Sequence, residues 1–207
     1  MPEKTNREYR AMTMQAEGSE DESKIVKGYA STFNQKYELF RDGEFIVSEI
    51  VDARAFDNCD MSDVIFQYDH CGRVFARKSN GTLRVQPDDI GLYIEADLGG
   101  TDAGRELYEE IKGGYTTKMS FGFIVSEDRW DDYPRADGTV ETVRTILKIS
   151  KLFDCSAVSL PANDNTSISI RSQLNGEIER LRAERLKADE IKRAKLALKI
   201  KIMQEVY

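Results

Sequence analysis

Large apolar side chains recur at every second position in the stretch Lys118-Met-Ser-Phe-Gly-Phe-Ile-Val125. This period of two predicts a β-strand that turns the methionine and the phenylalanines toward the core and Ser120 toward the opposite face. The same alternation in residues 92–98, Leu-Tyr-Ile-Glu-Ala-Asp-Leu, predicts a second half-buried strand. Between the two strands, Thr101 is a candidate N-cap and Gly113-Gly114 a stop signal, which together predict a short helix.

The remaining patterns predict three segments. Residues 1–23 are polar and acidic and predict a flexible N-terminal arm. Residues 24–171 carry strand periodicity, and a polar stretch at 128–138 predicts a hairpin loop. Residues 172–207 change to apolar steps of three and four and predict a helical tail, which either packs back on the body or binds another protein. The expected fold is mainly β with α, a small closed or nearly closed β-barrel with surrounding helices.

Candidate catalytic residues lie on three separate strand-like runs. His70, the only histidine of the chain, ends the run Val64–His70, Ser120 follows fifty residues later, and Asp154 lies in a third run. A serine, a base and an acid are the parts of a serine hydrolase. The alternatives are structural: a histidine at a strand end, a small serine beside a glycine, and an acid paired with Lys151. Asp69 is a rival acid, although its side chain is expected on the other face of the strand.

Two other chemistries compete for the same region. Cys71, Cys155 and His70 could be imagined as a zinc site, but they lack a closely spaced pair of ligands. Cys155 could also serve as the nucleophile of a cysteine protease. We expect no metal and no cofactor. An oxyanion hole is required, and backbone amides near the serine, Arg73 or Arg77 could supply it.

Five stretches occur in an order that resembles one protein family. They are Gly28-Tyr-Ala-Ser-Thr-Phe-Asn34, Tyr68-Asp-His-Cys-Gly-Arg-Val74, Asp89-Ile-Gly-Leu-Tyr-Ile-Glu-Ala96, Lys118-Met-Ser-Phe-Gly-Phe123 and Ser159-Leu-Pro-Ala-Asn163. Together they resemble the prohead serine proteases of tailed bacteriophages, which are distantly similar to the herpesvirus assemblins, over about residues 24–171. The family usually has a glutamate where this chain has Asp154.

The resemblance implies a serine endopeptidase that acts inside the immature capsid, or prohead, in the host cytoplasm. Its implied substrates are scaffold, or the scaffold-like extension of the major capsid protein, and the protease itself. The helical tail would then recruit the enzyme to the shell. A non-enzymatic capsid assembly or scaffolding protein is the competing class, and a hydrolase of small esters is a third.

Composition limits the partners further. No apolar run approaches the eighteen or more residues that cross a bilayer, and the N-terminus lacks the apolar core of a secretory signal, so no membrane partner is expected. The three cysteines are an odd number without a pattern and predict reduced thiols. Residues 171–207 carry 10 Lys and Arg against 6 Asp and Glu, whereas the remaining 170 residues carry 20 against 31. Nucleic-acid binding by this acidic body is therefore not expected.

Overall fold

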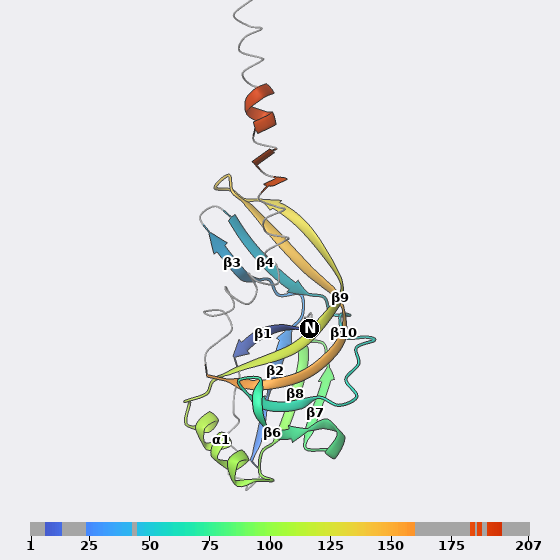
Figure 1. Ribbon diagram of the computed structural model, residues 1–207, viewed down its shortest axis with the longest axis vertical. Coiled ribbons are helices and arrows are strands. Elements are labelled where there is room, and N and C mark those ends of the chain that lie inside the picture. The colour runs from blue at the N-terminus through green and yellow to red at the C-terminus, as the bar shows by residue number, and fades with distance from the viewer. Residues whose placement is uncertain are drawn as a thin grey trace, which may run out of the picture. The chain divides into compact units, whose positions relative to one another are not determined.

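The computed structural model describes residues 7–13, 24–42 and 45–159, and farther along the chain residues 183–184, 186–187 and 190–195. The chain divides into two compact units, Met1–Ser167 and Ile168–Tyr207. The first unit consists mainly of strands (Figure 1), which confirms the prediction of a mainly β protein with few helices. Its elements are β1 (Glu8–Thr13), β2 (Ile25–Thr32), β3 (Tyr37–Asp42), β4 (Phe45–Val51), β5 (Ile65–Tyr68), β6 (Cys71–Arg77), η1 (Lys78–Asn80, a 3-10 helix), β7 (Leu83–Pro87), β8 (Gly91–Asp97), α1 (Asp102–Lys112), β9 (Lys118–Pro134) and β10 (Val140–Val158).

A seven-stranded sheet dominates the first unit. Its main path is β1-β9-β10-β4-β3, and β5 pairs with β10 on one side and β6 on the other. The long strands β9 and β10 are antiparallel, and β4 lies parallel to the first half of β10. In Figure 1, β3 and β4 accordingly lie alongside the part of β9 and β10 near their connection. The second half of β10 pairs with β5 instead.

The second sheet has three strands in the order β2-β8-β7. Residues from both sheets and from α1 form one hydrophobic core, in which Met119, Phe121 and Phe123 are buried as the alternation predicts. The predicted helix also forms, and the Thr101 side chain caps it by accepting a hydrogen bond from the Gly104 amide at 3.0 Å.

Two fold predictions differ from the structure. The described strands form these two sheets and no closed barrel is found among them, so the expected barrel is not confirmed. The polar residues 128–134 are not a loop, because they continue β9 and pair with the start of β10. Only residues 135–139 turn the chain, with Gly138 at a φ of 85°. The polar composition reflects an exposed strand surface rather than a break in the strand.

The prediction of a flexible arm over residues 1–23 is wrong for Glu8–Thr13, which form strand β1 at the edge of the large sheet. The reason is a buried ion network. Arg10 donates to both carboxylate oxygens of Glu49 at 2.6 Å, and Arg144 donates to Glu8 at 2.6 and 2.9 Å and to Glu49 at 3.1 Å. Paired charges therefore hold β1 in the sheet. Charged residues can be buried when they are paired with one another, and amino-acid composition alone does not show which of them are paired.

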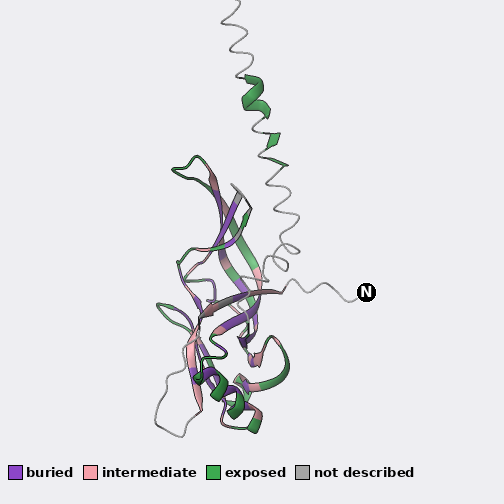
Figure 2. Ribbon diagram, turned by 90° about the vertical axis from the view of Figure 1, so that its left-hand side faces the viewer, coloured by how far each residue is buried: buried purple, intermediate pink, exposed green. Residues whose placement is uncertain are grey.

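The second unit is described only at ten positions. Residues 183–184, 186–187 and 190–195 are helical and exposed, whereas the rest of the predicted tail 172–207 lies outside the described residues. Figure 2 shows the contrast between the buried strands of the first unit and these exposed residues. In the described part of the chain, no helix has the length and apolar character needed to cross a membrane.

Candidate active site

His70 is positioned by a tight turn after β5. Asp69 and His70 both adopt left-handed backbone conformations, with φ of 48° and 58°. The turn is fastened to the end of β10, because the Asp69 amide donates to the Ala157 carbonyl at 2.9 Å and the Asp69 carboxylate accepts from the Ser159 amide at 2.9 Å. Asp69, the rival acid, thus binds Ser159, and the imidazole is directed back over the sheet toward β9 and β10.

The structure brings the three predicted side chains into one chain of hydrogen bonds. His70 Nε2 lies 2.7 Å from Ser120 Oγ, and His70 Nδ1 lies 2.5 Å from Asp154 Oδ2. Ser120 comes from β9 and Asp154 from the neighbouring β10, where Asp154 is paired with Gly122 across the strands. The suggested pairing of Asp154 with Lys151 does not occur, because Lys151 binds Asp60 at 3.0 Å.

A β-bulge directs Asp154 to the face on which Ser120 lies. Leu152 pairs with Phe123 and Asp154 pairs with Gly122, so Phe153 is an extra residue in β10. Leu152 and Phe123 are both buried in the core, and regular alternation from Leu152 would bury Asp154 beside them. The extra residue reverses the alternation, so Asp154 faces the histidine.

Asp154 is fully buried and held by three side chains. Besides His70, Ser156 donates to Asp154 Oδ2 at 2.6 Å, and Arg7 forms an ion pair with Oδ1. Burial raises the pKa of the Asp154 carboxyl, but the hydrogen bond and charge of His70, followed by Ser156 and Arg7, lower that pKa by more. The net shift is downward, so Asp154 is ionised at neutral pH and can accept a hydrogen bond from the N–H at His70 Nδ1.

The sequence patterns missed two residues that reach this site, Arg7 and Tyr9. The Tyr9 ring lies over His70, with ring centroids 4.3 Å apart, and the Arg7 guanidinium lies 4.5 Å from the Phe153 ring. A side chain at Gly122 would collide with the ends of the Arg7 and Asp154 side chains and would force both to shift. The one sequence signal was the glycine itself, whose missing side chain indicates close approach by another group.

The alternative chemistries lack the required geometry. Cys155 is buried in the core on the face opposite Asp154, and burial raises the pKa of its thiol well above the usual value, which disfavours a nucleophilic thiolate. Cys71 is exposed whereas Cys155 is buried, and among the described residues no three potential ligands gather in a geometry that could hold a metal ion. Of the two candidate oxyanion arginines, Arg77 binds the Asp63 carboxylate at 2.6 Å and Arg73 is exposed.

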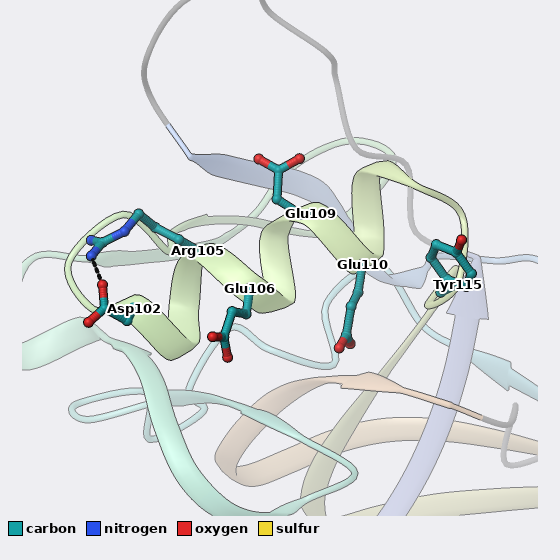
Figure 3. Close-up of a pocket in the computed structure, with 6 residues that line it drawn as sticks. All are labelled: Asp102, Arg105, Glu106, Glu109, Glu110 and Tyr115. Carbon is teal, nitrogen blue, oxygen red and sulfur yellow. Dashed lines mark hydrogen bonds and ion pairs between the residues drawn. The ribbon is translucent and has the colours of Figure 1, made fainter.

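One surface hollow lies away from these three residues. It has a volume of about 620 Å³ and follows the outer side of α1 (Figure 3). Its lining consists of Asp102, Arg105, Glu106, Glu109, Glu110 and Tyr115. None of the three hydrogen-bonded residues borders it, and Arg105 is already paired with Asp102. This hollow is therefore separate from the candidate active site.

Comparison with known proteins relates the chain to one family. Residues 10–180 match the model of the family described as caudovirus prohead serine protease. The prohead protease of Escherichia phage T5 is 26% identical over 162 residues, which cover 76% of this chain and 69% of that protein. No solved structure matches the chain. The matched region contains His70, Ser120 and Asp154 and begins immediately after Tyr9.

Proposed function

This chain belongs to the caudovirus prohead serine protease family, and we propose that it is an endopeptidase that uses Ser120, His70 and Asp154 as its catalytic triad. The observation that carries the proposal is the continuous chain of hydrogen bonds from Ser120 Oγ through the imidazole to the buried carboxylate. A nucleophile, a base and an orienting acid in this order match the roles of a serine protease.

The hydrogen bonds support one path for the proton. An ionised carboxylate only accepts hydrogen bonds, so Asp154 Oδ2 fixes the imidazole proton on Nδ1 and leaves Nε2 free to accept the Ser120 hydroxyl proton. Ser120 Oγ attacks the scissile carbonyl as that proton moves to His70. The imidazolium, stabilised by Asp154, then protonates the leaving amine as the peptide C–N bond breaks. Water, deprotonated in turn by His70, hydrolyses the acyl-enzyme and regenerates the serine.

The proposed substrates are those of head maturation. Family membership supports a capsid maturation role. We extend that role to scaffold or the scaffold-like extension of the major capsid protein, and to the protease itself, with cleavage inside the prohead. Aspartate in place of the family's usual glutamate is accommodated because the carboxylate reaches His70 Nδ1 at 2.5 Å.

Co-expression with the capsid protein of the same phage tests the proposal. Ser120→Ala and His70→Ala should each abolish conversion of the capsid protein to its shortened form on a gel. The double variant should lose little more than either single variant, because members of a triad act as a unit. Ser126→Ala is the matched control, since Ser126 lies on the same strand and bonds only to the Lys148 carbonyl at 3.3 Å.

Processing by Ser120→Ala at the wild-type rate would exclude the triad. Normal shells assembled with His70→Ala, together with an absence of any cleavage by the wild type, would favour a non-enzymatic assembly protein. Circular dichroism of each variant must match the wild type, so that loss of activity is not loss of fold.

A further inference from the structure

The proposed nucleophile is closed off from solvent. Ser120 and Asp154 each have 0% of their surface exposed, and the His70 side chain has 17%. A scissile carbonyl must approach Ser120 Oγ to within contact distance, with room for an oxyanion beside it. In the described arrangement that room is filled, so some group must move before a peptide is cleaved.

The filling groups come from the N-terminal end of the described chain. Strand β1 pairs antiparallel with β9, which sets Ala11 opposite Ser120 and Tyr9 opposite Gly122. The Tyr9 ring lies against His70, and Arg7 lies over Gly122 and forms its ion pair with Asp154. The Arg7 guanidinium is also 5.1 Å from the centroid of the Tyr9 ring, so the two side chains form one continuous cover.

The two faces of β1 have different partners. Glu8 and Arg10 point away from the triad into the ion network with Glu49 and Arg144. Arg7 and Tyr9 point toward the triad, and Arg7 precedes the first residue of the strand. The anchored face keeps β1 in the sheet, so we expect opening of the site to involve the side chains of Arg7 and Tyr9 rather than the whole strand.

We propose that Arg7 and Tyr9 occupy the position of the substrate segment beside the scissile bond, so that the described form is latent and a bound peptide opens it by displacing them. This inference rests on the proposed function. With a cover of this kind, the apparent reactivity of the serine equals its intrinsic reactivity multiplied by the fraction of molecules in which the cover is open. Arg7 and Tyr9 both precede the region matched by the family, which begins at Arg10.

A small serine-directed probe tests, without a protein substrate, whether the cover formed by Arg7 and Tyr9 restricts access to Ser120. The purified full-length protein is incubated with a fluorophosphonate, and the rate of covalent labelling is measured for the wild type, Arg7→Ala, Tyr9→Ala and the double variant. Removal of the cover should raise the labelling rate by about tenfold or more, most strongly in the double variant. Ser120→Ala gives the background.

Matched controls carry the same substitutions at the exposed end of β9. Arg129→Ala removes an exposed ion pair with Asp131, and Tyr133→Ala removes a ring that is 50% exposed. Both should label at the wild-type rate. If the Tyr9→Ala variant unfolds, the labelling rate of Arg7→Ala alone tests the proposal, because Arg7 lies outside strand β1.

Two results would contradict the proposal that Arg7 and Tyr9 cover the site. An unchanged rate would mean that the two side chains do not restrict access, and a lower rate would mean that they position the triad. In either case, continued processing of capsid protein by the wild type would leave the proposed function standing. Failure of every protein to label above the Ser120→Ala background, together with no processing, would instead remove the proposed function.

Discussion

The ion network under β1 should be among the most sensitive positions of the fold, and Arg10→Leu tests it. Arg10 and Glu49 are 3% and 0% exposed, and two hydrogen bonds of 2.6 Å join them. Removal of Arg10 leaves three carboxylates, those of Glu8, Glu49 and Asp128, around the single guanidinium of Arg144. Loss of one partner from a buried pair costs about 3–5 kcal/mol, because the remaining charge stays desolvated.

Urea unfolding at equilibrium measures this cost. With a slope of about 2 kcal/mol per molar urea for a domain of this size, the midpoint should fall by about 1.5–2.5 M. Arg41→Leu is the control, since Arg41 pairs with Glu38 on the exposed surface and its loss should leave the midpoint close to that of the wild type. The double variant Arg10→Leu/Glu49→Leu should be more stable than Arg10→Leu alone, because it restores the wild-type excess of one carboxylate over the guanidinium groups of the network. A shift below about 0.5 M for Arg10→Leu, or a double variant that is less stable than the single one, would refute the reasoning.

Further outcomes are expected near the site. Ser156→Ala removes one hydrogen bond to the Asp154 carboxylate and should lower kcat for peptide cleavage by about tenfold with KM nearly unchanged, as steady-state kinetics would report. Gly122→Ala should abolish cleavage and cost about 1–3 kcal/mol in urea unfolding, whereas Gly100→Ala, with open space around it, should do neither. Asp154→Asn should lower turnover far more than stability, and equal losses would argue against an orienting role. The lowered pKa of Asp154 contributes stability that is complete above the ordinary carboxyl pKa and is lost as pH falls through the lowered value, so acid unfolding should begin below about pH 4.

Local periodicity was sufficient to predict the parts of the fold that depend on one segment. Alternation in β9 placed Met119 in the core and Ser120 on the other face, and the cap at Thr101 located the start of α1. The pairing of Ser120, His70 and Asp154 could be predicted because each residue lies on a strand-like run, and the family resemblance supplied their order. Their catalytic roles stay predictions until the variants are assayed.

Features that depend on distant partners could not be predicted in this way. Strand β1 looks like a polar arm because Arg10 and Glu49 are 39 positions apart, and each is costly to bury without the other. The position of Arg7 beside Asp154 depends on the same anchoring. The bulge at Phe153 leaves no mark in the local pattern, because it is defined only by the register against β9.

The irregular middle of β10 also separates two tasks within a single strand. The pairing of β10 with β9 shifts at four places between Ile146 and Asp154, whereas it is regular from Val140 to Ile146 and again from Asp154 to Val158. In an unbroken 19-residue strand, the orientation of the first side chain would dictate that of the last. Here three of the four shifts place an extra residue in β10, namely Leu147, Ser150 and Phe153, and each of these reverses the alternation. The residues that pair with β4 and those that pair with β5 therefore take their orientation independently. Sequence drift in the distal hairpin, including gain or loss of a residue there, can therefore be absorbed before it reaches the hydrogen bond between Asp154 and His70.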